Sequence, residues 1–207
     1  MAKHPQSIDS RILDRIRRHG AGWVFTPADF HDLGNRGAVA IALKRHKDAG
    51  LIRQVARGLY DVPRQHKALG VLWPDLDTVI DAIKRRDAVR LQPTGAYAAN
   101  LLGLTEQVPM RVVFLTDGPQ RTFKLGNLSI SFKNTTPRNM ATAGSISGLV
   151  IQAMRWMGQN NIDDATVKQL RKKLDRKAKA QLLADLRHAP VWIAERMREI
   201  AQDGKAR

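Results

Sequence analysis

The sequence predicts an α+β fold, with a small helical and hairpin region first, a mixed α/β region next and helices at the end. Two observations support this prediction. Before residue 50 and after residue 145, apolar residues recur at the spacing of one helix face. Around residues 51–62 and 110–133, short continuous or alternating apolar runs are instead typical of strands joined by tight turns.

Three helices are predicted within the first 50 residues. Ser7 can cap the first helix, whose isoleucines and leucine fall on one face. A short extended segment follows at residues 23–25. Pro27 then opens a second, short helix, because proline is favoured at the first helical position. The third helix is expected over residues 36–49, and Gly50 is a good residue to end it.

Residues 50–62 are the most informative stretch of the chain. Two short apolar runs flank Arg57-Gly58, which predicts a tight β-hairpin with an arginine at its tip. A helix, a glycine and such a hairpin form the end of a winged helix-turn-helix, in which one helix enters the DNA major groove beside the wing. The alternative is a small α/β subdomain with a solvated hairpin. We favour DNA binding and place this domain at residues 1–67.

The charge of the chain supports a polyanionic partner. Lys and Arg number 35 against 19 Asp and Glu, a net charge of +16, and such an excess most often serves nucleic-acid binding. The net charge is +7 over residues 1–70, +2 over residues 71–165 and +7 over residues 166–207. Two basic ends predict two surfaces that face polyanions, or one such surface and one that meets an acidic or RNA-bearing partner.

The second domain is predicted over residues 68–207. The segment 64–74 is expected to be a connector, docked on the body by its apolar residues Leu69, Val71, Leu72 and Trp73. The expected elements are a helix at 75–86, a strand at 88–92, a helix at 93–102, a strand at 110–116, a hairpin within 122–133, and helices at about 145–158, 163–174, 176–188 and 190–202.

The candidate DNA-binding residues lie on the third helix and the hairpin: Asn35, Arg36, Lys44, Arg45, Lys47, Arg53 and Arg57. The exposed face of the helix has small residues beside its cations, which permits close approach to a groove while the cations meet phosphates or guanine edges. Asn35 could either pair with adenine or cap the helix. Arg57 is the foremost candidate for a phosphate or minor-groove contact. His46 lies on the core side and is expected to be packed.

A second basic run lies near the C-terminus: Lys168, Arg171, Lys172, Lys173, Arg176, Lys177 and Lys179. Leucines and a valine at helical spacing bury one side of these predicted helices, so the cations gather on the other side as a ridge. Two interpretations remain open for the ridge. It is either a binding surface or a solvated helix face.

No catalytic, metal or cofactor site is predicted. The chain has no cysteine, which excludes disulfides, thiolate metal sites and cysteine nucleophiles. It has no glycine-rich phosphate loop, no histidine pair at metal-binding spacing and no spacing that suggests a Ser/His/Asp arrangement. The start of the sequence lacks the apolar region of a signal peptide, and no apolar run approaches 18 residues. We therefore expect a non-enzymatic cytoplasmic protein without a membrane segment.

Several motifs resemble the AbiEi-type antitoxins of bacterial type IV toxin–antitoxin systems. They are the third-helix run GAVAIALKR at 37–45, DAGLI at 48–52, RGLY at 57–60 ahead of Pro63, LQPTGAYAANLLGL at 91–104 and the strand and turn at 112–118. The resemblance covers about residues 7–135. The chain departs from the family at His46, where a leucine is common, and it is short beside the larger members.

The resemblance implies a function. Such antitoxins bind inverted repeats upstream of their own operon through the winged helix and repress it, and their C-terminal domain counteracts a nucleotidyltransferase-like toxin, without a stable complex, in systems tied to phage resistance. Because these toxins act on nucleotides or tRNA, we expect the basic ridge to meet the same RNA. The alternatives are a stand-alone winged-helix transcriptional regulator with a ligand-sensing C-terminal domain, and an RNA-binding protein.

Overall fold

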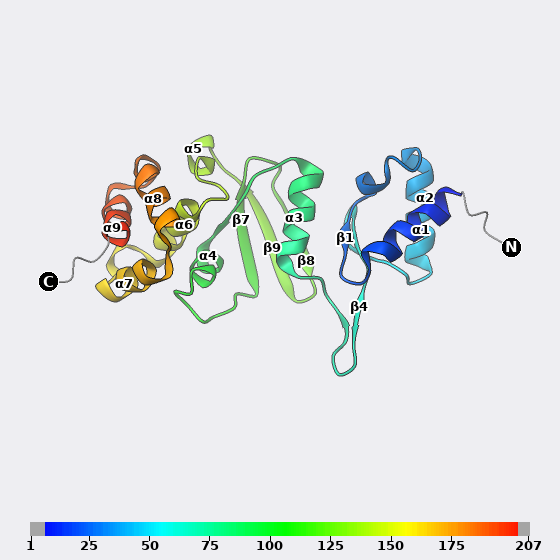
Figure 1. Cartoon of the computed structure of the whole chain (residues 1–207), viewed down its shortest axis with the longest axis horizontal. Coiled ribbons are helices and arrows are strands. Elements are labelled where there is room, and N and C mark those ends of the chain that lie inside the picture. The colour runs from blue at the N-terminus through cyan, green and yellow to red at the C-terminus, as the bar shows by residue number, and fades with distance from the viewer. Residues whose placement is uncertain (1–6, 203–207) are drawn as a thin grey trace. The chain divides into compact units, whose positions relative to one another are not determined.

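The computed structural model describes residues 7–202 and has the predicted α+β class (Figure 1). The chain forms two compact units. The first runs to Ala88 and includes Lys124–Gly126, and the second comprises Val89–Phe123 and the chain from Asn127 onward. The boundary expected after residue 67 therefore falls inside the first unit, because residues 68–88 fold together with the N-terminal elements.

The first unit has the element order of a winged helix-turn-helix. It contains α1 (Ile8–His19), β1 (Val24–Phe25), the 3-10 helix η1 (Pro27–Phe30), α2 (Arg36–Asp48), β2 (Arg53–Ala56) and β3 (Leu59–Asp61). The strands form an antiparallel sheet in the order β1-β3-β2. The predicted second helix is a single 3-10 turn, with Pro27 at its first position and a capping box between Thr26 and Asp29 at its N-terminal end.

The core of this unit lies between the helices and the small sheet. Ile12 and Ile16 of α1, Phe25 of β1 and Leu43 of α2 are all buried in it. Phe30 meets the Phe25 ring edge-on, with centroids 5.4 Å apart. Burying each such side chain contributes about 1.5–3 kcal/mol, so η1, although short, is fixed in place by its phenylalanine.

The segment predicted as a docked connector is a second hairpin. Strands β4 (Arg64–His66) and β5 (Gly70–Leu72) pair antiparallel. The expectation that its apolar residues dock was wrong for Leu69 and Val71, which are 71% and 48% exposed, whereas the Trp73 ring lies against the Arg53 guanidinium. The turn is held locally instead: the Nδ1 atom of His66 accepts the backbone N–H groups of Ala68 and Leu69, and Gly70 supplies a positive φ of 70°.

Helix α3 (Leu76–Asp87) completes the first unit. It buries Val79, Ile80 and Ile83, and it ends at Ala88 in the left-handed conformation, with φ of 51°. With α3 the first unit extends 21 residues beyond the predicted boundary, from residue 68 to Ala88.

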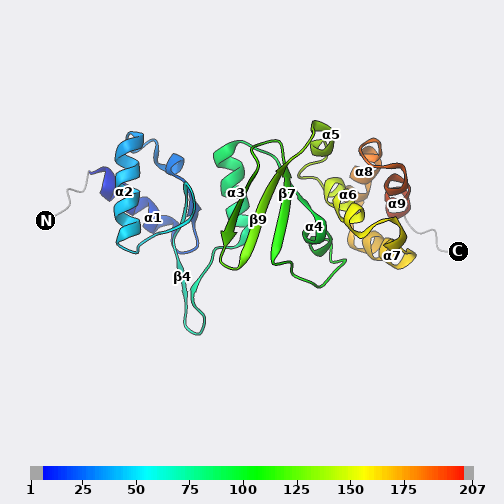
Figure 2. The ribbon, with the colours of Figure 1, turned by 180° about the vertical axis from the view of Figure 1, so that it is seen from behind.

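The second unit begins with a four-stranded sheet in the order β6-β7-β9-β8. Its elements are β6 (Leu91–Thr94), α4 (Gly95–Leu101), β7 (Arg111–Thr116), β8 (Arg121–Leu125) and β9 (Leu128–Asn134). β6 runs antiparallel to β7. β9 runs parallel to β7 and lies beside it (Figure 2). The predicted strand and hairpin thus join one mixed sheet, and alternate residues of β7 are buried on one of its faces.

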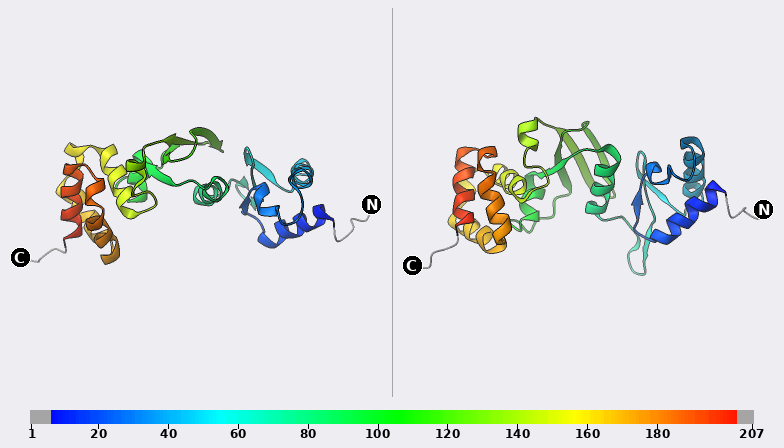
Figure 3. Two further views of the ribbon diagram at one scale, coloured as in Figure 1. Left: turned by 90° about the horizontal axis from the view of Figure 1, so that it is seen from above. Right: turned by 45° about the horizontal axis from the view of Figure 1, so that its top comes forward.

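Helices make up the rest of the second unit (Figure 3). They are α5 (Pro137–Met140), α6 (Ile146–Met157), η2 (Gln159–Asn161), α7 (Asp164–Lys173), α8 (Arg176–Ala184), η3 (Leu186–His188) and α9 (Val191–Ala201). The four predicted helices are present, except that the one expected at 176–188 is divided into α8 and η3. α6 is buried along most of its length and shares one apolar core with α4, α7, α8 and α9.

Candidate nucleic-acid interface

Helix α2 is positioned by its cap and by its buried face. The side chain of Asn35 accepts the N–H of Ala38 at 2.9 Å, so the structure gives Asn35 the capping role. Val39, Leu43 and His46 point into the core. This fixes which face of the helix remains outside.

The outward face of α2 carries small residues beside a cation, as the sequence predicts. Gly37, Ala40, Ile41 and Lys44 are exposed, and Ile41 keeps 57% of its surface in water. Short side chains at the first two positions leave room for a partner to approach the helix backbone. The structure therefore presents a helix with its N-terminal half uncovered.

The cations of α2 differ in how freely they are presented. Arg36 and Arg45 are exposed, and neither has an ion-pair partner within residues 7–202. Lys44 pairs with Asp48 at 2.7 Å, and this hydrogen bond lowers the pKa of the Asp48 carboxyl. Lys47 is half-buried at the edge of the helix. Arg36 and Arg45 are thus the cations best placed to meet an anion.

His46 is a packed residue, as expected. It is 3% exposed, and its Nε2 atom lies 3.4 Å from Oδ1 of Asp9 on α1. The pair joins the two helices at the place where a leucine was expected from the family resemblance, so a polar contact replaces an apolar one there.

The wing is the hairpin of β2 and β3, with its turn at Arg57-Gly58. Gly58 has φ of +66°, which the turn requires and glycine adopts without strain. Arg57 is exposed at the tip, as predicted. The Arg57 carbonyl accepts a hydrogen bond from Nη1 of Arg86 at 2.9 Å, and Arg86 also pairs with Asp87. The wing tip is therefore tethered to α3.

Arg53 does not join this surface. Its guanidinium donates to both oxygens of Asp61, at 3.0 and 2.6 Å, and to the Leu72 carbonyl at 2.9 Å. It also lies 4.1 Å from the ring centre of Trp73. Since Asp61 is only 1% exposed, Arg53 neutralises a buried carboxylate and fastens the base of the second hairpin.

A hollow of about 380 Å³ lies between the wing tip, η1 and the start of α2. It is lined by Thr26, Pro27, Ala28, His31, Arg36, Gly58 and Arg86. Arg36 and His31 can donate hydrogen bonds into it, whereas the Arg86 guanidinium is already bonded to Asp87 and to the Arg57 carbonyl. Such donors suit an anion such as a phosphate group. The sequence could not predict this site, because Arg86 lies 29 residues from the wing that it supports.

The C-terminal basic run divides into two kinds of residue. Arg171 donates through Nε and Nη2 to the Glu199 carbonyl at 3.1 and 2.7 Å, which joins α7 to α9. Lys173 lies 3.4 Å from the Leu101 carbonyl, and Lys179 is half-buried and engaged in the fold. The remaining four are exposed and make no ion pair in the described part of the chain: Lys168, Lys172, Arg176 and Lys177.

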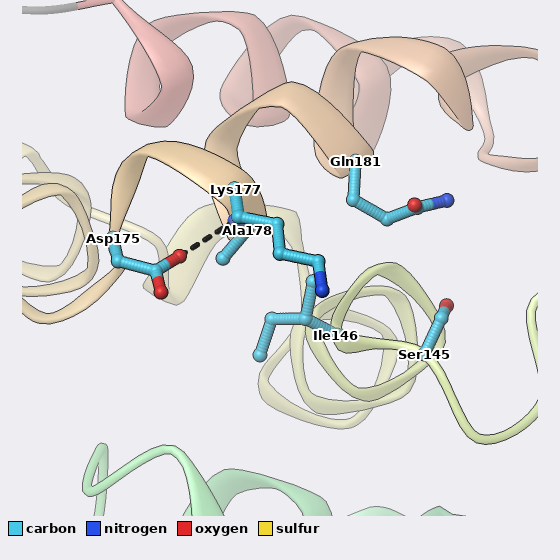
Figure 4. Close-up of a pocket in the computed structure, with 6 residues that line it drawn as sticks. All are labelled: Ser145, Ile146, Asp175, Lys177, Ala178 and Gln181. Atoms are coloured by element: carbon cyan, nitrogen blue, oxygen red, sulfur yellow. Dashed lines mark hydrogen bonds between the residues drawn. The ribbon is translucent and has the colours of Figure 1, made fainter.

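A second hollow, of about 400 Å³, lies beside Lys177 in the second unit (Figure 4). Its other lining residues are Ser145, Ile146, Asp175, Ala178 and Gln181. Asp175 caps α8 through Ala178, and Ser145 caps α6. The Asp175 carboxylate and the Lys177 ammonium thus both line this hollow, and the Lys177 side chain extends over it.

Among residues 7–202, no three His, Asp or Glu side chains are grouped so that they could hold a metal ion. In the same range, no helix combines the length and apolarity needed to cross a lipid bilayer.

Comparisons with known proteins complete the description. Curated protein sequences contain no match to the chain. Among solved structures, the crystal structure of RV2827C protein from Mycobacterium tuberculosis is similar, with a TM-score of 0.45 and 15% identity over 94% of this chain and 76% of that one. A family of unknown function (DUF6088) matches residues 11–182, and the chain therefore belongs to that family.

Proposed function

We propose that this protein is the antitoxin of a bacterial type IV toxin–antitoxin system. In this proposal the first unit binds operator DNA and represses the operon, and the second unit counteracts a nucleotidyltransferase-like toxin in the cytoplasm. One observation carries the DNA-binding half: the cation-lined hollow between the wing tip and the exposed start of α2. The antitoxin half is supported by the sequence resemblance and by the free cations of the second unit.

The first unit can meet duplex DNA in a definite way. The outward face of α2 enters the major groove, where Gly37 and Ala40 allow close approach. A backbone phosphate occupies the hollow beside Arg36 and Arg86, and Arg57 at the wing tip meets the backbone or minor groove. Phosphate contacts of this kind fix the register of the protein on DNA and make the affinity depend on salt.

The second unit offers a smaller cationic surface than the sequence predicted. Four of its cations, Lys168, Lys172, Arg176 and Lys177, are exposed and unpaired within residues 7–202. They can hold RNA or an acidic toxin surface. This surface does not include Arg171, Lys173 and Lys179, because their side chains interact with other residues of the protein.

Co-expression with the neighbouring gene tests the proposal. The intact protein should restore growth to cells that express a downstream nucleotidyltransferase-like toxin, and it should bind the region upstream of the operon in a salt-sensitive manner. Changing Lys168, Lys172 and Arg176 to Glu should abolish rescue and spare DNA binding. Reversing Arg187 and Arg198, which are exposed elsewhere on the second unit, is the matched control.

The outcomes separate the two halves of the proposal. DNA binding without any rescue would favour the stand-alone regulator, and rescue without DNA binding would remove the repressor role. Full rescue by a well-expressed triple reversal would reduce the C-terminal cations to a solvated helix face.

A further inference from the structure

One side chain on α2 is not explained by phosphate binding. Ile41 is 57% exposed, although α2 is otherwise a basic helix with four Arg or Lys and one Asp among its 13 residues. Single exposed apolar residues are common on protein surfaces. Ile41 is informative because of its position on the outward face of the helix proposed to enter the groove.

The residues next to Ile41 on the helix do not cover its side chain. Gly37, one turn before it, has no side chain, and Ala40 beside it has only a methyl group. On its other side, Lys44 is drawn toward the C-terminal end of α2 by its 2.7 Å ion pair with Asp48. Ile41 is therefore the most prominent uncharged side chain on the N-terminal half of this face.

The chemistry of the major groove gives such a side chain a partner. The edges of the bases present hydrogen-bond donors and acceptors there, and one apolar group, the C5-methyl of thymine. A cation or amide cannot use that methyl group, whereas isoleucine can. The branched Cβ of isoleucine also leaves essentially one χ1 rotamer in a helix, so little side-chain freedom is lost on contact.

We infer that Ile41 contacts the C5-methyl group of thymine and makes the protein prefer a thymine at one position of each half-site. This inference rests on the proposed DNA binding, and it adds a base preference that phosphate contacts cannot supply. The hollow at Arg36 and Arg86 positions α2, and Ile41 then distinguishes thymine from a base without the methyl group.

The test compares thymine with deoxyuridine, which lacks only that methyl group. The DNA site of the full chain is first mapped by footprinting on the upstream region, and each thymine in it is then replaced in turn. Replacement at one position per half-site should weaken wild-type binding about fourfold, the factor that corresponds to burying one methylene-sized group. Replacement at the other thymines should change little.

Variants identify the residue responsible. Ile41→Ala should bind the thymine and deoxyuridine sites equally, and Ile41→Val, which keeps its branched methyl groups, should retain most of the preference. Leu51→Ala is the matched control, because Leu51 is also exposed, at 48%, but lies beyond the end of α2. It should keep the wild-type preference.

Three results would overturn the inference. Wild-type protein could bind the site with no thymine sensitive to replacement, or Ile41→Ala could keep the wild-type profile. Alternatively, Ile41→Ala could change the sedimentation of the free protein and not its base preference, which would assign Ile41 to a contact between copies. Absence of any salt-sensitive binding by the wild type would instead overturn the proposed function itself.

Discussion

Two arginines of the same hairpin have opposite roles, although the sequence presents them alike. Arg53 stands at the base of the wing and neutralises Asp61, which is buried. Arg57 stands at the tip and is exposed. The difference arises from tertiary structure: Leu72 and Trp73, which complete the environment of Arg53, lie about 20 residues further along the chain.

Matched alanine variants should separate these roles. Arg57→Ala should leave stability unchanged, weaken DNA binding for all sequences and reduce the slope of log affinity against log salt by about one. Arg53→Ala should lower the free energy of unfolding by about 2 kcal/mol or more, because it leaves a buried carboxylate unpaired. Urea unfolding and salt-dependent binding titrations measure both effects. A stable Arg53→Ala with the Arg57→Ala binding defect would contradict this assignment.

Asp117 should make the second unit sensitive to acid. Hydrogen bonds from the Arg90 side chain and backbone hold the pKa of this carboxyl below its ordinary value of 3.8. As the pH falls, the unfolded chain takes up this proton before the folded one does, so the stabilisation is present above the ordinary pKa and is lost as the pH falls through the lowered one.

Urea unfolding at pH 7 and near pH 3.5 tests this. Asp117→Asn should be less stable than the wild type at pH 7, by a modest amount because the pair is partly exposed, and the gap should narrow at the lower pH. The matched variant Asp185→Asn, which replaces another partly exposed carboxylate that accepts a hydrogen bond from Gln181, controls for the change from a carboxylate to an amide. An unchanged gap would show that Asp117 does not contribute to the acid response.

At the scale of elements, the tether between the wing and α3 is the feature that the sequence could not predict. Helix, turn and hairpin follow from local patterns. The sequence indicates the hairpin turn at Gly58, a short helix from Pro27, which is a 3-10 turn, and Asn35 as either a cap or a base contact, of which the structure shows the cap. The bond from Arg86 to the Arg57 carbonyl has no local pattern, because it depends on how α3 packs.

The second hairpin was missed for a different reason. β4 and β5 have three residues each, and the loop between them lacks an Asn-Gly type of turn. Its turn is held by the His66 ring, a contact that residue patterns do not encode. We also expected Leu69 and Val71 to be buried because they are apolar, but this two-stranded ribbon has no second layer that covers them.

We expect Arg86 to support DNA binding in two ways. It holds the wing tip in place through the Arg57 carbonyl, and it lines the hollow proposed to bind a phosphate. Arg86→Ala should lower affinity more than Arg57→Ala, because it removes a cation from the hollow and frees the wing tip. Amide hydrogen exchange should rise at the wing turn in this variant. Arg85→Ala is the control, since Arg85 is the exposed neighbour on α3 and does not line the hollow. If Arg86→Ala and Arg85→Ala changed DNA affinity and hydrogen exchange at the wing turn equally, the tether would be contradicted.

At the scale of the whole molecule, the division into two units decides where the chain can be cut. The boundary predicted from composition lies after residue 67, because residues 64–74 resemble a connector. The structure instead assigns α3 to the first unit, and Val79, Ile80 and Ile83 of this helix are buried. A chain that begins at residue 68 would carry this helix without the unit that it belongs to, and would expose about three large apolar side chains.

Two truncated chains should therefore behave differently. A chain of residues 89–207 should stay soluble and keep neutralising the toxin while it loses operator binding, because the mixed sheet and the helical core both lie in the second unit apart from the turn at Lys124–Gly126. A chain of residues 68–207 should aggregate or unfold at lower temperature, since exposed apolar patches promote association.

Growth rescue, thermal melts and sedimentation distinguish the two truncated chains. The full-length Arg57→Ala and Arg86→Ala double variant controls for the loss of DNA binding without truncation, and it should rescue growth as well as residues 89–207 do. If residues 89–207 fold, as judged by a cooperative melt, and yet fail where the double variant rescues, the first unit contributes to neutralisation, and the two activities are not divided between the two units.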